Sequence, residues 1–133
     1  MDRMIFVNLP VSDVTVARRF YTGLGFTVNE TFSDDSCACI VVSDTIFVML
    51  LNRQRFTDFI PGAVHTDPGR TEVINCLSAA SREEVDELYG HALAGGGKPW
   101  MDTMDEGPMY GHSFADPDGH AWEILYMDMS QIG

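Results

Sequence analysis

The sequence lacks a long hydrophobic run, a disulfide framework and any sizeable cluster of basic residues. No apolar stretch approaches the roughly 18 residues of a membrane-spanning helix, and the first residues do not form the apolar core of a signal peptide. Cys37, Cys39 and Cys76 leave an odd thiol and no C-x-x-C spacing. We therefore expect a chain without membrane or secretory segments, located in the reducing cytoplasm.

Positive charge is scarce: 8 Lys and Arg stand against 20 Asp and Glu, which gives a formal net charge of -12 at pH 7. No basic run is longer than Arg18-Arg19. Such a field would repel nucleic acid and anionic membranes, so neither is expected as a partner, whereas a cationic ligand is permitted. The 133 residues, 45% of them hydrophobic, predict one globular domain.

Hydrophobic patterning predicts the order β-α-β-β-β in the first half. Apolar residues at three- and four-residue spacing follow a candidate N-cap at Ser12 or Asp13 and stop at Gly23 and Gly25, which predicts a helix. Pro10 is expected to end the first strand. The predicted strands are 4–9, 26–32, 37–42 and 45–51.

The same order is predicted again in the second half. Ser81 and Glu84 have the spacing of a capping box, and Gly95–Gly97 is expected to end the helix that they begin. The predicted strands are 71–77, 98–104, 109–115 and 120–127. Module one then covers about 1–52, a connector with a short helical turn about 53–69, and module two about 70–128 of a single domain.

An internal repeat follows from these two halves. An offset of 68 positions relates Leu9 to Leu77 and Phe20 to Leu88, and an offset of 74 relates Asp44 to Asp118. A sheet with a helix on one face leaves its other face available. We therefore predict an α+β fold in which two βαβββ modules form a curved sheet around a central cleft.

Three segments carry a resemblance to a known family: Leu9–Asp13, Arg19–Phe26 (RFYTGLGF) and Ser113–Leu125 (SFADPDGHAWEIL). Together they resemble the vicinal oxygen chelate superfamily, which includes glyoxalases, bleomycin-resistance proteins and extradiol dioxygenases. The turn at Ser33–Asp35 and the strand at Val42–Leu50 look most like small bacterial predicted lactoylglutathione lyases. The resemblance covers nearly the whole chain and implies the βαβββ pair and, commonly, a homodimer.

In metal-dependent members of this superfamily, a divalent ion held by four side chains binds two substrate oxygens. The resemblance places two ligand positions at Glu123 and Phe6, and the repeat offsets place the other two at Met49 and Ile74. Hydrocarbon side chains cannot coordinate such a cation, and a thioether is a poor ligand for Mg, Mn, Zn or Ni. We therefore do not favour a divalent metal as cofactor, and any metal ligation is expected to involve Glu123 without a complete site.

A shift of two residues in strand register would change this ligand set, because alternate residues share a strand face. Asn8, Glu72 or Cys76 would then replace apolar residues. Even so, only one or two oxygen or sulfur donors would be added.

Glu123 and His112 are the candidate catalytic residues. A carboxylate on an apolar, inward strand face suits a general base for proton abstraction beside a carbonyl, and His112 could reach the cavity beside it as an acid–base partner. The structural alternatives are a hydrogen-bonded core Glu123 and a surface or dimer-edge His112. Cys37 and Cys39 share a strand face and are expected to be small buried hydrophobes.

Adaptable and aromatic side chains near residues 100–114 could line a pocket for a small-molecule ligand. Together with the apolar residues at the ligand positions, the expected ligand-binding set is Phe6, Met49, Ile74, Trp100, Met109, Tyr110 and Phe114, with Met101 and Met104 nearby.

Two functions follow from this set. One is a glyoxalase-like protein, as a lyase or isomerase acting on an oxygenated substrate with Glu123 as base. The other is a metal-free protein of the bleomycin-resistance type that sequesters a drug or metabolite. Both hypotheses, an enzyme and a binding protein without catalysis, stay open at this point.

Overall fold

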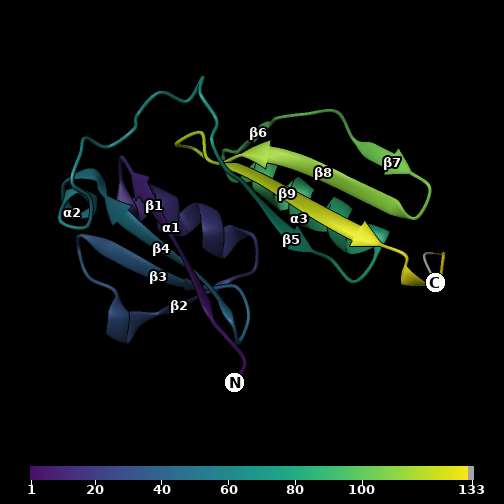
Figure 1. The fold of residues 1–133 in the computed structure, drawn as a ribbon, viewed down its shortest axis with the longest axis horizontal. Coiled ribbons are helices and arrows are strands. Elements are labelled where there is room, and N and C mark those ends of the chain that lie inside the picture. Colours follow the sequence, from purple (N-terminus) through teal and green to yellow (C-terminus); the bar gives the residue numbers. More distant parts are fainter. Residues whose placement is uncertain (132–133) are drawn as a thin grey trace. The chain divides into compact units, whose positions relative to one another are not determined.

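The computed structural model describes residues 1–131, which divide into two compact units, residues 1–67 and residues 68–131. Each unit contains one sheet with one longer helix packed against it (Figure 1). The α+β fold with two related modules is therefore confirmed, with one sheet of four strands and one of five. No helix among the described residues is long and apolar enough to cross a lipid bilayer.

The first unit is built on a four-stranded sheet in the order β1-β4-β3-β2. The strands β1 and β4 pair in parallel, and the other pairs are antiparallel. The side chains of Val48, Leu50 and Ile40 are fully buried on one face, together with Ala17 and Phe20 of α1. The elements are β1 (Ile5–Val11), α1 (Val14–Gly23), β2 (Thr27–Asn29), the 3-10 helix η1 (Glu30–Phe32), β3 (Cys37–Val41), β4 (Ile46–Asn52) and α2 (Arg53–Thr57).

The second unit is built on a five-stranded sheet in the order β5-β9-β8-β6. The fifth strand, β7, pairs with the beginning of β8 at Met109–Gly111. The helix α3 packs against β8 and β9 and covers the buried side chains of Phe114, Trp122 and Ile124. The opposite face of this sheet carries the candidate site. The elements are β5 (Ile74–Ser78), α3 (Arg82–Ala94), β6 (Lys98–Pro99), β7 (Met104–Glu106), β8 (Met109–Ala115), β9 (Ala121–Met127) and η2 (Met129–Gln131).

Local signals placed both long helices correctly. Asp13 caps α1 by accepting a hydrogen bond from Val16 N at 3.1 Å, and Ser81 caps α3 by accepting one from Glu84 N at 3.1 Å. The carboxylate of Glu84 reaches back to the N–H of Ala80 at 2.9 Å, so the capping box satisfies two backbone donors.

Several strand boundaries differ from the prediction, among them that of the predicted strand 71–77, which begins only at Ile74. The first strand continues through Pro10 to Val11, because β1 lies at the edge of its sheet, where a missing N–H is tolerated. The predicted strand 26–32 ends at Asn29, which caps η1 through its side chain. The predicted strand 98–104 consists of the short strands β6 and β7, with residues 100–103 between them outside regular structure.

Strand register supports the internal repeat. In the first unit Asn8 is the Cα partner of Met49, and in the second unit Cys76 is the Cα partner of Glu123. The same offsets of 68 and 74 positions relate these two parallel pairs. Positions predicted to be equivalent from the sequence are therefore equivalent within the two sheets.

Candidate ligand-binding site

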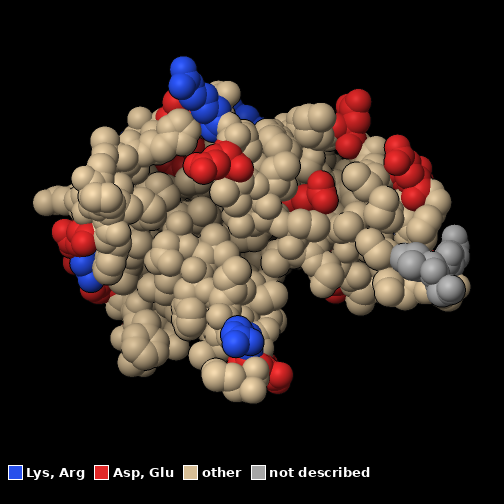
Figure 2. Space-filling model, in the orientation of Figure 1, with Lys and Arg blue, Asp and Glu red and all other residues tan. Residues whose placement is uncertain are grey.

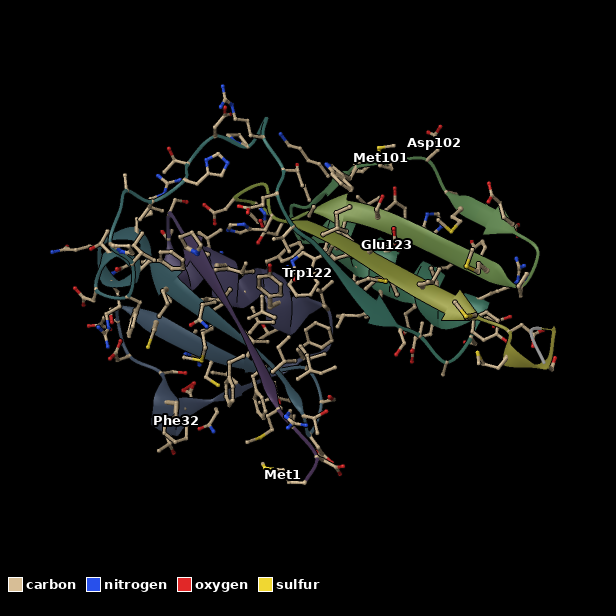
Figure 3. All side chains as sticks on the ribbon, viewed as in Figure 1. Met1, Phe32, Met101, Asp102, Trp122 and Glu123 are labelled. Carbon is tan, nitrogen blue, oxygen red and sulfur yellow. The ribbon has the colours of Figure 1, made fainter. Side chains whose placement is uncertain are left out.

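Glu123 lies on the open face of the second sheet. Its neighbours along β9, Trp122 and Ile124, are buried beneath α3, so the alternation of side chains along a strand directs Glu123 to the other face (Figure 3). Its Cα partners are Ser113 on β8 and Cys76 on β5. The half-buried carboxylate therefore has a hydroxyl and a thiol on the two adjacent strands.

Cys76 donates a hydrogen bond from its Sγ to Oε1 of Glu123 at 3.4 Å. Partial desolvation of the thiol, followed by the hydrogen bond to Glu123 and that residue's negative charge, raises the pKa of Cys76 to about 11. Cys76 is therefore a neutral hydrogen-bond donor at pH 7 and has little thiolate character.

A pocket of about 370 Å³ opens beside Glu123. This volume is within the range of small-molecule sites, and the mixture of apolar side chains with a few polar groups is typical of them. The floor comes from the adjacent strands β5, β9 and β8, and the wall comes from residues 100–104, where Figure 3 shows Met101 and Asp102. The pocket is lined by Ile74, Trp100, Met101, Asp102, Met104, Gly111, His112, Ser113 and Glu123.

Apart from His112, the ionisable side chains of this lining are acidic. Asp102 and Glu123 contribute carboxylates, and the lining contains no Lys or Arg. Acidic side chains are also spread over the molecular face drawn in Figure 2, where basic side chains occupy few places. An anion entering this pocket would find no Lys or Arg along its walls.

The imidazole of His112 lies on the face of the sheet that packs against α3. It stacks on the ring of Tyr89 with 4.1 Å between centroids and an interplanar angle of 4°, and its Nε2 lies 3.2 Å from Oδ1 of Asp86. Its Nδ1 lies 3.1 Å from Oγ1 of Thr103. His112 contributes to the pocket lining, but the structure pairs its ring with Asp86 rather than with Glu123.

The other residues expected to bind a ligand are separated in the structure. Ile74 and Trp100 line the pocket, whereas Met109 lies further along β8 and outside its lining. Tyr110 contacts Asp86 on the α3 side at 2.5 Å, and Phe114 is buried there.

The two expected residues of the first unit lie on the open face of that unit's own sheet. Phe6, which is 49% exposed, stacks on Phe47 with 4.8 Å between ring centroids. Met49 pairs with Asn8 and Cys39 on its two neighbouring strands. An aromatic stack therefore occupies the strand positions equivalent to Ile74 and Ala121.

The donor chemistry does not fit the four-ligand metal centre that the resemblance implies. The side chains of Phe6, Met49 and Ile74 offer no oxygen or nitrogen, and the group hydrogen-bonded to the Glu123 carboxylate is the protonated thiol of Cys76. Among the described residues, no three His, Cys, Asp or Glu side chains lie close enough together to hold a metal ion.

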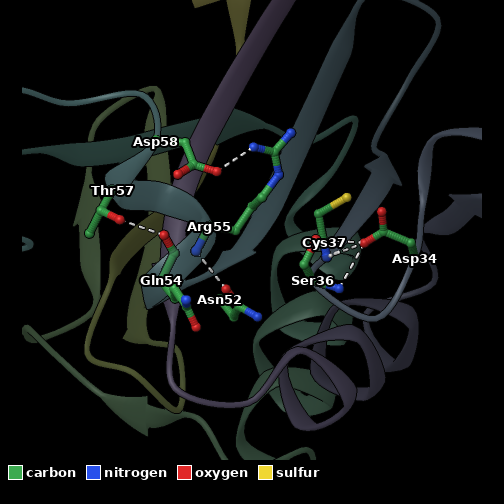
Figure 4. A network of polar contacts seen from close by, with 8 residues as sticks. All are labelled: Asp34, Ser36, Cys37, Asn52, Gln54, Arg55, Thr57 and Asp58. Carbon is green, nitrogen blue, oxygen red and sulfur yellow. Dashed lines mark hydrogen bonds and ion pairs between the residues drawn. The ribbon is translucent and has the colours of Figure 1, made fainter.

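A second, more polar cavity of about 210 Å³ lies in the first unit, lined by Ser36, Asn52, Gln54, Arg55 and Asp58 (Figure 4). Its polar groups are largely paired with one another. Asn52 caps α2 through Arg55 N at 2.7 Å, and the guanidinium of Arg55 donates to Asp58 at 2.7 Å. On the adjoining loop, Asp34 accepts three hydrogen bonds from Ser36 and Cys37, of which the side-chain bond from Ser36 has the largest effect in lowering the pKa of Asp34. The polar groups around this cavity therefore mainly stabilise a turn and the N-terminus of α2, since they hydrogen-bond to one another.

Sequence reasoning missed Asp102 and Ser113 as pocket residues. The turn at 116–119 closes the β8–β9 hairpin with Ala115 opposite Ala121, and counting back from that pair puts Ser113, not His112, opposite Glu123. The alternation of side chains along β8, counted from this pair, could therefore have identified Ser113 from the sequence. Asp102 lies in the irregular segment, where no periodic pattern indicates the direction of a side chain.

Comparisons with known proteins agree with this architecture. Residues 3–43 match the family described as bleomycin resistance protein-like N-terminal. No curated protein matches the sequence. Among solved structures, the hypothetical protein SA1046 from S. aureus superposes with a TM-score of 0.79 at 27% identity, over 95% of this chain and 94% of that one.

Two further solved structures have names that describe the superfamily. A glyoxalase-related enzyme from Fulvimarina pelagi is 22% identical with a TM-score of 0.79, over 95% of this chain and 88% of that one. A glyoxalase/bleomycin resistance protein/dioxygenase family enzyme from Burkholderia phytofirmans is 15% identical with a TM-score of 0.77, over 95% and 99%.

Residues 3–43 therefore match a bleomycin-resistance-like family, and the chain has the fold of proteins whose names describe the glyoxalase/bleomycin resistance/dioxygenase family. Both findings support the resemblance to the vicinal oxygen chelate superfamily noted in the sequence. More narrowly, the chain's first 43 residues contain the segment that matches the bleomycin-resistance-like family.

Proposed function

We propose that the protein binds a small, partly apolar molecule with a positively charged group in the pocket of the second unit, without the superfamily's metal centre, and thereby sequesters it. One observation carries this proposal: the pocket of about 370 Å³ has a largely apolar lining, two carboxylates and no Lys or Arg. Burial of a ligand's apolar body supplies most of the affinity, and a carboxylate beside its charge supplies selectivity.

The pocket residues have distinct roles in this proposal. The indole of Trp100 and the flexible side chains of Met101 and Met104 receive the apolar body, because thioether side chains adapt to irregular shapes. Glu123 receives the cationic group. Its Oε1 already accepts from Cys76, so Oε2 is the oxygen left to meet the ligand.

Three matched ligands test the charge preference: naphthalen-1-ylmethylamine, naphthalen-1-ylmethanol and 1-naphthoate, which share one ring system. Calorimetry is expected to rank their affinities as cation, then neutral alcohol, then anion. Glu123→Gln should weaken amine binding by about three- to tenfold, since a charge-assisted contact is lost, and should change alcohol binding less than twofold.

Glu106→Gln is the control, because Glu106 is an exposed carboxylate of β7 outside the pocket. It changes the net charge by the same amount and should leave amine affinity within twofold. Equal losses in both variants, or equal binding of amine and naphthoate, would contradict the proposed site. Metal analysis of protein purified without chelator should find no stoichiometric divalent ion.

A second function is favoured by the setting of Glu123, a half-buried carboxylate in a largely apolar pocket. In a lyase or isomerase, this carboxylate would take a proton from the carbon next to a carbonyl and return it to the neighbouring carbon, with no other change in composition. The hemithioacetal of methylglyoxal and glutathione is the test substrate. Turnover that Glu123→Gln abolishes would support the enzyme and contradict pure sequestration.

The homodimer expected from the resemblance stays a prediction. Light scattering is the direct measurement, and a mass near twice the 14.8 kDa of one chain would support it.

A further inference from the structure

The wall of the pocket has little secondary structure of its own. Residues 100–103 join the short strands β6 and β7, and Met101 in this segment is 66% exposed. A segment of this kind gains its position from tethers to neighbouring elements rather than from a continuous ladder of hydrogen bonds. The affinity of the pocket therefore depends on what holds this wall.

One set of tethers lies on the pocket side of the sheet. Ser113, which is buried, accepts a hydrogen bond at its Oγ from Met101 N at 2.9 Å, and its carbonyl accepts one from Trp100 N at 3.3 Å. These contacts fix the beginning of the wall segment against β8.

The second tether reaches the wall from the other side of the sheet. Thr103 Oγ1 lies 3.1 Å from Nδ1 of His112, whose side chain is 15% exposed. Two residues of α3 hold that ring: Tyr89 stacks on it, and Asp86 contacts its Nε2. The end of the wall is thus connected through His112 to a helix that does not line the pocket.

Asp86 determines which atoms donate and which accept in the hydrogen bonds from Asp86 through His112 to Thr103. An ionised carboxylate only accepts, so the imidazole has a hydrogen on Nε2, and in the tautomer with its single hydrogen there Nδ1 accepts from the Thr103 hydroxyl. Tyr110 donates to the same Oδ1 of Asp86 at 2.5 Å, which holds the carboxylate in place. The Tyr110 hydrogen bond to Asp86, before desolvation and nearby charge, raises the pKa of Tyr110, so its hydroxyl stays a donor at neutral pH.

We propose that Thr103 and His112 form a latch that positions the pocket wall, so that α3 controls ligand binding without touching the ligand. Both are positioning residues in this scheme, and the ligand-binding part rests on the function proposed above. Because Glu123, the carboxylate proposed to meet the cation, lies on β9 and not in the wall, loss of the latch should weaken binding of cationic and neutral ligands alike.

Thr103→Val and Thr103→Ser form the matched test, because valine keeps the shape of threonine and removes the hydroxyl, while serine keeps the hydroxyl. Thr103 is exposed, so neither change threatens folding. We expect Thr103→Val to weaken naphthalen-1-ylmethylamine and naphthalen-1-ylmethanol by the same factor of roughly two to ten, the range that one hydrogen bond supplies. Thr103→Ser should stay within twofold of the unchanged protein.

Tryptophan fluorescence tests the latch without any ligand. Trp122 is 2% exposed and shielded from acrylamide, so quenching reports on Trp100 in the wall. Thr103→Val should raise the quenching constant by about half or more, and Thr103→Ser should restore it. His112→Phe, which keeps a ring to stack on Tyr89, should reproduce the effect of Thr103→Val, and the double variant should be no worse than either single one.

Several results would overturn the latch: quenching that is unchanged in Thr103→Val, equal effects of valine and serine, or additive effects in the double variant. If the amine fails to bind the unchanged protein, the proposed function fails, but the quenching comparison still decides whether the latch holds the wall.

Discussion

The thiol of Cys76 is hydrogen-bonded to the carboxylate of Glu123 across the parallel pair β5 and β9, with 3.4 Å between Sγ and Oε1. The thiol is the donor, so the carboxylate keeps its charge and one oxygen of it is oriented. Cys76 thereby acts as a neutral support for the best candidate ligand-binding carboxylate, rather than as a nucleophile.

Removing the charge of Glu123 should make Cys76 more reactive. Glu123→Gln eliminates the carboxylate hydrogen bond and its negative charge, two of the three causes of the raised pKa, while desolvation remains. Alkylation of Cys76 by iodoacetamide at pH 8.5, followed by peptide mass spectrometry, should accelerate roughly three- to tenfold, since each unit of pKa changes the thiolate fraction up to tenfold. Cys37 in the same digest is the internal control and should react at an unchanged rate.

The raised pKa of Cys76 also predicts how stability depends on pH. The folded state holds the thiol proton more tightly than the unfolded state, so this contribution is present below the ordinary value of 9.0 and is lost as pH rises through about 11. As pH rises from 8.5 to 11, the urea midpoint of the unchanged protein should therefore fall relative to the urea midpoint of Cys76→Ala. A difference that stays constant over this range would contradict the assignment.

Gly111 should resist substitution even by alanine. A Cβ at this position would lie 2.9 Å from the carbonyl oxygen of Ile124 and 3.1 Å from Cδ1 of Leu125. Gly111→Ala is expected to cost about 1–3 kcal/mol of unfolding free energy, as overpacking usually does. Gly90→Ala in α3 is the control, because nothing lies within 4 Å of its new methyl group, and it should gain up to about 1 kcal/mol from helix propensity.

The two helix caps should contribute similar stability, because they occupy matching positions of the repeat. Ser81→Ala and Asp13→Ala each remove a side-chain acceptor from a backbone N–H, and each should cost about 1 kcal/mol in denaturant unfolding. Ser81→Asp should recover most of the loss. A serine-to-aspartate variant no more stable than the alanine variant would contradict the role of the cap.

Features encoded by adjacent residues were predictable from the sequence. The caps at Asp13 and Ser81, the positive φ of +99° at Gly25 and the bounds of β8 all depend on side chains within a few positions of each other. Pro10 misled the prediction, because the effect of a missing N–H depends on whether the strand lies at an edge, and the sheet order decides that.

The candidate site was only partly predictable, because it combines strands far apart in the sequence. The repeat offsets correctly predicted that Glu123 and Met49 occupy equivalent strand positions. The alternation of side chains along the strand correctly placed Glu123 on the sheet face opposite to Trp122 and Ile124. The partner of His112 could not be found in this way, since Asp86 and Thr103 meet it only when α3 and residues 100–104 pack against β8. The choice of ligand-facing residues within 100–104 likewise follows from tethers rather than from periodicity.

The absence of room around Gly111 has a consequence for how this protein could diversify. The floor beneath the pocket cannot be reshaped by adding side chains at that position without displacing β9. Selection for a new ligand would therefore act mainly on the rim at 100–104, where the exposed side chains of Met101 and Asp102 can be exchanged at little cost to stability.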